Sequence, residues 1–435
     1  MNTAVRPIKT AAENALVEQF TAAKARLPGN RDAREKAFGA VVEGLPHRRV
    51  EEWKYTDLRA LMRDAKPLAD LPTDAQVAAV DRKRVLTSFD ASKIVFANGS
   101  LIESLSDLGK LPAGVEAVSL AKAYASDLPL LARFGEAEAP EDNAAIALNT
   151  AFVSDGVLIR IAAGTKVDRP LHLAFGQDGE GHASYARILI VVEDDAKVEI
   201  VESHFGEGHH QTNSYVELLA GDRTDINLIK LQAESLDTQH LATLAIKLGA
   251  ESSLQTVAVA RGSDVARQQV FVKFEGDNTK ASLNGISLSG ARRHLDTTFF
   301  ADHASYGCES RELFKSVLDG DSRSVFQGKI LVRQNAQKTD GRMMSRALML
   351  SEGSEADLKP ELEIYADDVQ CAHGATCGAL DEDHLFYLMA RGISKIDAQA
   401  ILVEAFVGEV LDMVEDEGLK DALAVVTNSW LMARD

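Results

Sequence analysis

Hydrophobic residues at helical spacing dominate the start of the chain. Within residues 10–27 the apolar positions Leu16, Phe20 and Ala23 lie near helical spacing, which predicts a helix. The breaker Pro-Gly-Asn at residues 28–30 ends this helix, and a second helix is predicted over residues 31–45. Short strand signals follow at residues 93–96 and 115–120, and residues 142–152 return to a helical pattern.

The middle of the chain, from residue 156 to about 365, has a different pattern. Short runs in which polar and apolar residues alternate are typical of half-buried strands. The clearest runs lie at residues 157–161, 188–192, 198–201, 226–231 and 254–260.

An internal repeat runs through these strands. An apolar strand end, a tight polar turn and a new alternating strand recur, and the copies align on Asp194, Gly221, Gly249 and Gly276, at steps of 27, 28 and 27 residues. Looser copies lie at residues 318–321 and 350–353. A fixed step built from short strands predicts a β-solenoid, whose coils bury their inward side chains by stacking on each other. An antiparallel meander is the alternative, but it need not keep a fixed step.

The last part of the chain is predicted to be helical again. Residues 383–391 form one helix that ends at Gly392, and Ser394 caps the next, with Asp397 in the Glu/Gln place of a capping box. A final helix is predicted over residues 419–432. The expected division is an N-terminal helical and small mixed region (1–140), a β-helix core (141–378) and a C-terminal helical region (379–435).

Charge and composition exclude several classes of partner. The 435-residue chain has a formal net charge of −19 and no dense Lys/Arg run, so neither nucleic acid nor an anionic membrane is an expected partner. Residues 1–10 lack a secretory signal, and no apolar run of about 18 residues occurs. Three cysteines are too few for a disulfide framework, so the expected compartment is the reducing cytoplasm.

Common catalytic motifs are missing. Gly328-Lys329 has the wrong spacing for a phosphate-binding loop, and Ile330 stands where Ser or Thr is required. No G-x-S-x-G or H-E-x-x-H sequence occurs. The chain is therefore expected to be a non-catalytic protein that does not hydrolyse ATP alone.

The densest group of soft metal ligands is Cys371, His373 and Cys377. Thiolates and imidazoles suit zinc, copper and iron–sulfur iron. Cys371 and His373 are two residues apart, so they point to the same side of an extended strand. The spacing is not that of a standard zinc finger, and packing roles for these side chains remain open.

The other cysteine and several histidines have simpler interpretations. Cys308 is predicted to be a core residue. His204, His209 and His210 are interpreted as a strand-end residue and a loop pair, and Trp53 as an anchor for packing or an interface.

Two segments resemble the SufB/SufD family of the SUF iron–sulfur cluster assembly system. The first is residues 49–59, which contain Glu-Glu-Trp-Lys-Tyr-Thr, closer to the SufD-type than to the SufB-type members. The second is residues 363–376, which end in Cys-Ala-His-Gly-Ala-Thr, followed by residues 385–388 and 391–393. The similarity extends over nearly the whole chain.

This resemblance implies a right-handed parallel β-helix flanked by helical regions, serving as a scaffold for nascent cluster assembly. It implies pairing with SufB through an edge of the β-helix, self-pairing as a homodimer when alone, and SufC ATPase binding through the C-terminal helices, which would also pack on the end of the β-helix. It places Cys371 and His373 at the SufB interface, where they ligate iron or a nascent cluster, or only shape the joint. Contact with a reduced flavin in the complex stays open.

Two other functions compete with the scaffold. One is a β-solenoid enzyme acting on polysaccharides, which would need clustered acidic and basic residues in a groove. The other is a binding module stabilised by zinc on Cys371, His373 and Cys377, which should retain about one metal per chain.

Overall fold

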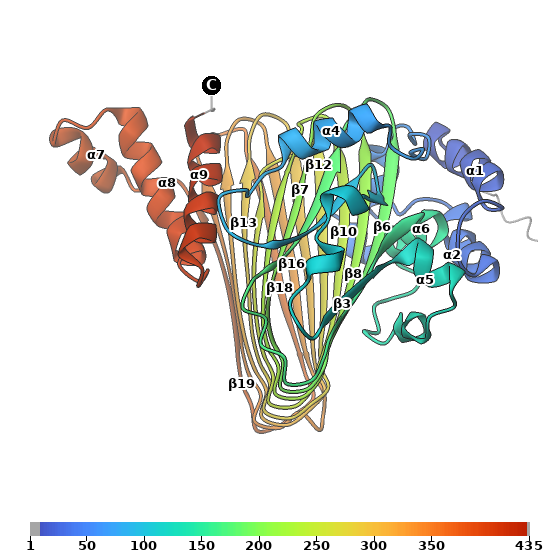
Figure 1. Ribbon diagram of the computed structural model, residues 1–435. Helices are drawn as coiled ribbons and strands as arrows, with labels where there is room; N and C mark the ends of the chain where they lie inside the picture. The colour runs from blue at the N-terminus through green and yellow to red at the C-terminus, as the bar shows by residue number, and fades with distance from the viewer. Residues whose placement is uncertain (1–8, 433–435) are drawn as a thin grey trace, which may run out of the picture.

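Parallel pairing between successive coils organises the structure, a computed structural model that describes residues 9–432. Strands two apart in sequence are neighbours, so each coil gives one strand to each of two sheets (Figure 1). The even sheet runs β18-β16-β14-β12-β10-β8-β6-β4-β3 and the odd sheet β19-β17-β15-β13-β11-β9-β7-β5-β1-β2. The predicted β-solenoid is therefore confirmed, with about eight turns in the described residues.

The strands are β1 (Ser92–Ala97), β2 (Ser100–Leu101), β3 (Val115–Ser119), β4 (Asp155–Ile161), β5 (Leu171–Gln177), β6 (Ala183–Val192), β7 (Lys197–Gly206), β8 (Gln211–Ala220), β9 (Asp225–Glu234), β10 (Gln239–Leu248), β11 (Ser253–Ala260), β12 (Val265–Phe274), β13 (Lys280–Ser289), β14 (His294–His303), β15 (Glu309–Leu318), β16 (Arg323–Val332), β17 (Asp340–Met349), β18 (Glu355–Ile364) and β19 (Gln370–Gly378). The helices are α1 (Ala11–Ala23), α2 (Arg31–Val42), α3 (Leu58–Leu61), α4 (Asp74–Lys83), α5 (Leu120–Ala125), α6 (Ala144–Phe152), α7 (Glu382–Ala390), α8 (Lys395–Leu411) and α9 (Glu417–Met432), with 3₁₀ turns η1 (Glu51–Trp53), η2 (Glu103–Leu105), η3 (Leu108–Lys110) and η4 (Pro129–Arg133).

The corners that lead from the even to the odd sheet repeat the same backbone conformation. The residue two positions before each of β7, β9, β11 and β13 has a left-handed backbone, with φ of 59° at Asp195, 55° at Arg223, 56° at Glu251 and 57° at Asn278. Counting from these residues makes Gly221, Gly249 and Gly276 equivalent to each other and to Glu193. The alignment from sequence was therefore wrong by one position at Asp194. The Asp194 carboxylate accepts a hydrogen bond from the Asp222 N–H (2.9 Å), so this side chain supports the next corner.

Close stacking explains the corner glycines. A Cβ atom on Gly276 would lie 1.9 Å from the Ala250 nitrogen, and one on Gly249 would lie 2.6 Å from the Gly221 carbonyl carbon. The left-handed conformation falls on other residues, so these glycines serve close backbone approach rather than positive φ. The looser copies at residues 318–321 and 350–353 lie at the opposite edge, because they join odd strands to even ones.

Helices cover the outer faces of both sheets. α1, α2 and α6 pack on the even sheet, where Phe20, Phe38 and Phe152 form an aromatic cluster with the first two rings stacked at 4.1 Å. Strand β1 pairs in parallel with β5, and β3 pairs antiparallel with β4. The first 140 residues therefore also extend both sheets at this end.

The Glu-Glu-Trp-Lys-Tyr-Thr segment anchors the N-terminal region on the even sheet. The Arg267 guanidinium lies 4.0 Å from the centroid of the buried Trp53 ring and forms an ion pair with Asp296 (2.5 Å). It also donates a hydrogen bond to the Glu52 carbonyl (2.7 Å). These contacts confirm Trp53 as a packing anchor.

The C-terminal helices pack on the flank of the solenoid, not on its end as expected. Outward residues of the odd strands, including Val257 and Leu288, form an apolar cluster with Val407, Leu423 and other residues of α8 and α9. Because an apolar outer face of a parallel sheet must be covered, the C-terminal helices pack against the side of the solenoid. Ser394 caps α8 by accepting the Asp397 N–H, as predicted. Among residues 9–432, no helix is long and apolar enough to span a membrane.

We expect Gly276→Ala to lower the free energy of unfolding by about 1–3 kcal/mol, because the new methyl group overlaps backbone of the adjacent coil. Urea unfolding measures this change. Gly408→Ala in α8 is the matched control: its Cβ meets no atom within 4 Å, and alanine favours a helix by up to about 1 kcal/mol. Equal effects of the two substitutions would contradict the stacking role of Gly276.

Candidate functional site

The last two strands leave open edges at one end of the solenoid. β18 pairs only with β16, and β19 only with β17, among the strands that the structure describes. An unpaired strand edge presents free backbone N–H and C=O groups to another chain. Exposed Ile364 and Tyr365 lie beside these groups at the end of β18. This end of the solenoid therefore has both a backbone template and apolar surface.

Strand β19 carries the cysteine and histidine residues that the sequence singled out. Cys371 is paired in register with Gly341, His373 with Met343 and Cys377 with Ala347. Met343 and Ala347 are buried, and Met343 belongs to the core between the sheets. By strand alternation, the three β19 side chains share the face that continues this inner row.

These three side chains differ in their surroundings and do not converge. Cys371 is half-buried against the core, whereas His373 and Cys377 are exposed. Six residues of extended strand separate Cys371 from Cys377 by about 20 Å at roughly 3.3 Å per residue. Within one chain the three cannot hold a single zinc ion, so the geometry excludes the three-ligand zinc module.

The surroundings of Cys371 favour its thiol form. Burial raises the pKa of the Cys371 thiol above its usual value, and the nearby acidic groups of Asp340 and Glu312 act in the same direction. The Gly341 N–H opposes this shift without cancelling it. A cation that approaches Cys371 would favour the thiolate and displace the proton.

Glu312 is a buried carboxyl group that the sequence reasoning missed. It lies on β15, paired in register with Leu283 and Met343 of the same inner row that ends at His373. Both carboxyl oxygens are buried and without a hydrogen-bond partner among the described residues. Burial raises the pKa of Glu312 to about 8. Ser310 and Arg311 lower this pKa, but they offset the effect of burial only in part. Strand register is the signal that locates it, because alternation alone does not say which face is inside.

The remaining candidate residues have packing roles. His204 is the one whose surroundings the sequence did not predict. Cys308 is fully buried, as predicted, and its Sγ lies 3.3 Å from the Gly276 carbonyl oxygen. His209 and His210 form the predicted loop pair between β7 and β8. His204 lies inside the solenoid beside Glu202, with its Nε2 2.5 Å from the carboxylate. Glu202 pairs in register with Lys230, one coil later, and the two form an ion pair. The 28-residue repeat step is the sequence signal that could have located this pair.

A second exposed surface lies on the C-terminal helices. α7 buries none of its residues within the described structure and projects away from the solenoid (Figure 1). Phe386 is 73% exposed and Tyr387 56% exposed, and Ile396 and Ile401 of α8 are also exposed. These exposed apolar side chains lie on two helices that contact each other, which makes this face a candidate interaction surface.

Comparisons with known proteins agree with this architecture. Residues 175–406 match the family described as "SUF system FeS cluster assembly, SufBD core domain", and residues 18–173 match "SufBD protein N-terminal region". A Synechocystis iron–sulfur cluster assembly SufBD family protein is 32% identical over 393 residues, which cover 87% of this chain and 86% of that protein. The Escherichia coli iron–sulfur cluster assembly protein SufD is 29% identical over 384 residues, covering 87% of each chain.

The fold and the site define a parallel β-solenoid with one open, cysteine-bearing end. The core-domain match covers more than half of the chain, and the N-terminal match adjoins it. The chain belongs to the SufBD family of iron–sulfur cluster assembly proteins. The similarity to Escherichia coli SufD confirms the resemblance that the motif at residues 51–56 indicated.

We expect Glu312 to make stability depend on pH. Its carboxyl group has a pKa of about 8 when folded against an ordinary value of 4.5, so the folded state holds its proton more tightly. Stability is therefore lost as pH rises from about 4.5 towards 8, with a limiting slope of about 1.4 kcal/mol per pH unit. Glu312→Gln should remove this loss. Urea unfolding of both proteins at pH 5.5 and 7.5 measures this loss. If the wild-type protein and the variant lose the same stability between these pH values, the buried-acid assignment is refuted.

Proposed function

We propose that the chain is the SufD-type scaffold subunit of the SUF system, pairing with SufB through the β18–β19 edge and binding the ATPase SufC through α7 and α8. The observation that carries this proposal is the open pair of strand edges beside a cysteine. The subunit itself is non-catalytic, and ATP hydrolysis is assigned to SufC.

Strand addition at the open edge supports the pairing with SufB. β19 can gain backbone hydrogen bonds from a partner strand, and Ile364 and Tyr365 add apolar area beside it. The same edge of a second copy offers an isologous contact, so a homodimer forms when SufB is absent.

The nascent iron–sulfur cluster, or iron, is the cargo of this interface. Cys371 supplies a thiolate and His373 an imidazole from one side, and SufB completes the set of ligands. Cys371 must lose its proton to bind iron, so cargo binding should release a proton near neutral pH. No residue of this chain is assigned to a flavin.

Exposure of α7 supports its role in SufC binding. α8 and α9 bury apolar residues against the odd sheet, whereas Phe386 and Tyr387 of α7 do not. Removing all residues after Leu380 would uncover the odd sheet as well as the partner surface. Substitutions on α7 are therefore the sharper test.

We expect the double variant Phe386→Ser, Tyr387→Ser to weaken SufC binding at least about tenfold, because exposed aromatic residues are frequent binding hot spots. Calorimetry with purified SufC measures the dissociation constant. Leu71→Ser, at an 84% exposed apolar residue remote in sequence from these helices, is the matched control and should bind normally. Unchanged binding by the double variant would contradict this surface assignment.

We expect Cys371→Ser and His373→Ala each to lower cluster yield in the reconstituted complex while leaving complex formation intact. Serine keeps the size of cysteine but is a poor iron ligand. Cluster absorbance and iron content measure the yield, and gel filtration measures the complex. Cys308→Ser is the control for a buried thiol and should act through stability.

The outcomes separate two roles for Cys371 and His373. Normal yield from both variants in an intact complex would reduce the subunit to a structural partner. Loss of the complex in both would show that these residues are needed for the interface itself.

A further inference from the structure

Three buried side chains meet inside the solenoid, remote from Cys371. His204 of β7, Glu234 at the end of β9 and His240 near the start of β10 place their donor atoms within 4.8 Å of one another. Each of the three is at most 3% exposed. The turn of residues 235–238 brings Glu234 and His240 together, and coil stacking adds His204. Two imidazoles and one carboxylate are the donor set that Fe²⁺ and Zn²⁺ prefer.

One donor atom in this cluster is free. His240 Nδ1 lies 2.7 Å from Glu234 Oε2 and 2.8 Å from the Thr212 hydroxyl, so Nδ1 carries the proton when the ring is neutral. Its Nε2 is buried without a hydrogen-bond partner among the described residues. An ion bound by Glu234 and His240 together would take the place of the proton that Nδ1 and Oε2 share, and Nε2 would then carry the ring proton.

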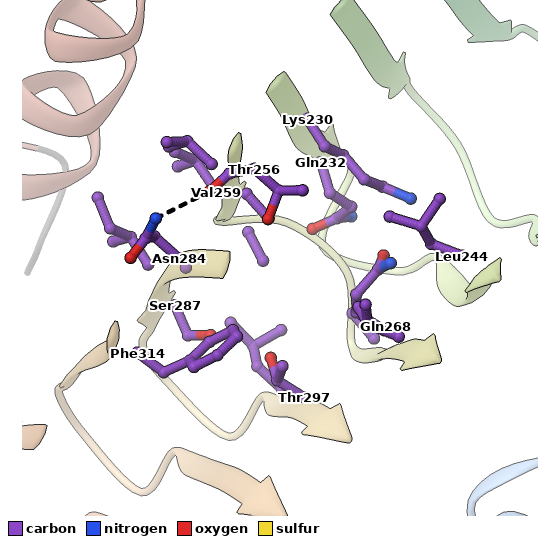
Figure 2. Close-up of a pocket in the computed structure, with 18 of the residues that line it drawn as sticks. Lys230, Gln232, Leu244, Thr256, Val259, Gln268, Asn284, Ser287, Thr297 and Phe314 are labelled. Atoms are coloured by element: carbon purple, nitrogen blue, oxygen red, sulfur yellow. Dashed lines mark hydrogen bonds between the residues drawn. The ribbon is translucent and has the colours of Figure 1, made fainter. Parts of the chain in front are cut away.

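A cavity adjoins His240. His240 is one of the residues that line a cavity of about 50 Å³ between the two sheets. Figure 2 shows Lys230, Gln232 and Gln268 among the side chains on its wall. A water molecule needs about 10–15 Å³, so the cavity has room for a water that accepts a hydrogen bond from the His240 ring.

The cluster is tied to its neighbours by polar contacts. Glu234 accepts hydrogen bonds from the Thr212 hydroxyl (3.0 Å) and the Gln232 amide (3.0 Å). Lys230 forms an ion pair with Glu202 (2.9 Å), the carboxylate that also contacts His204 Nε2.

We propose that His204, Glu234 and His240 form a buried binding site for a divalent transition-metal ion of the Fe²⁺ or Zn²⁺ type. The site is separate from the Cys371 and His373 interface and does not depend on the proposed function. A bound ion would join β7, β9 and β10 from the inside.

The test measures metal binding by the full-length chain. Protein purified from cells supplied with Zn²⁺ or Fe²⁺, and protein dialysed to equilibrium against either ion alone under anaerobic conditions, is analysed for metal content. We expect about one saturable equivalent that survives the combined Cys371→Ser, His373→Ala and Cys377→Ser changes. His204→Asn or His240→Asn should weaken binding at least about tenfold. The two metals loaded separately distinguish an iron site from a zinc site.

A matched control guards against general damage to the solenoid. His303 is also buried inside, with Nε2 3.0 Å from the Ser310 hydroxyl, and is outside the cluster, so His303→Asn should keep the metal. Absorption of the Co²⁺-loaded wild-type protein gives a second reading that needs no variant: nitrogen and oxygen ligands without a thiolate charge-transfer band are expected. Absence of saturable metal in the wild-type chain, or metal lost with the cysteine changes and kept without His240, would overturn the site.

Discussion

Parallel backbone pairing between successive coils is the interaction on which the rest of the structure depends. A buried N–H or C=O group without a partner is costly, so each coil needs a neighbour on both sides. At the start of the solenoid, β1 and β3 provide that neighbour for β5 and β4. At the other end, β18 and β19 have one neighbour each in the described chain, and Cys371 lies on that edge. The candidate interface is thus the place where the repeat stops.

The same stacking sets the requirements at the corners and on the outer faces. Neighbouring strands lie about 4.8 Å apart, which leaves no space for side chains between stacked turns. Gly249 and Gly276 meet this limit, and Asp194 uses its carboxylate to support the following turn. Parallel sheets have apolar outer faces that must be covered. The N-terminal helices cover the even sheet, α8 and α9 cover the odd sheet, and α7 remains available to a partner.

Much of the fold could be predicted from the sequence, because helical periodicity and a fixed repeat step are local signals. The helices near both ends and the solenoid were predicted correctly. The errors came from long-range geometry: Asp194 was aligned one position off, and the repeat copies near residues 320 and 352 lie at the opposite edge. Polar turns look alike at both edges, so a single repeat pattern cannot separate them.

The site was predictable only in part. The grouping of Cys371 and His373 follows from alternation along one strand. Glu312 and the cluster of His204, Glu234 and His240 depend on which face of each strand points inward, and a shift of one residue reverses that face. Their donors also come from strands far apart in sequence, which only the register of the coils brings together.

Hydrogen–deuterium exchange along the last coils tests most directly whether the open end is the partner surface. The chain would be measured at a concentration where it is monomeric, alone and with SufB. We expect fast exchange at the free amides of β18 and β19 in the lone chain, and clear protection of both strands in the pair. Unchanged exchange in β18 and β19, with protection on another surface when SufB is bound, would contradict it.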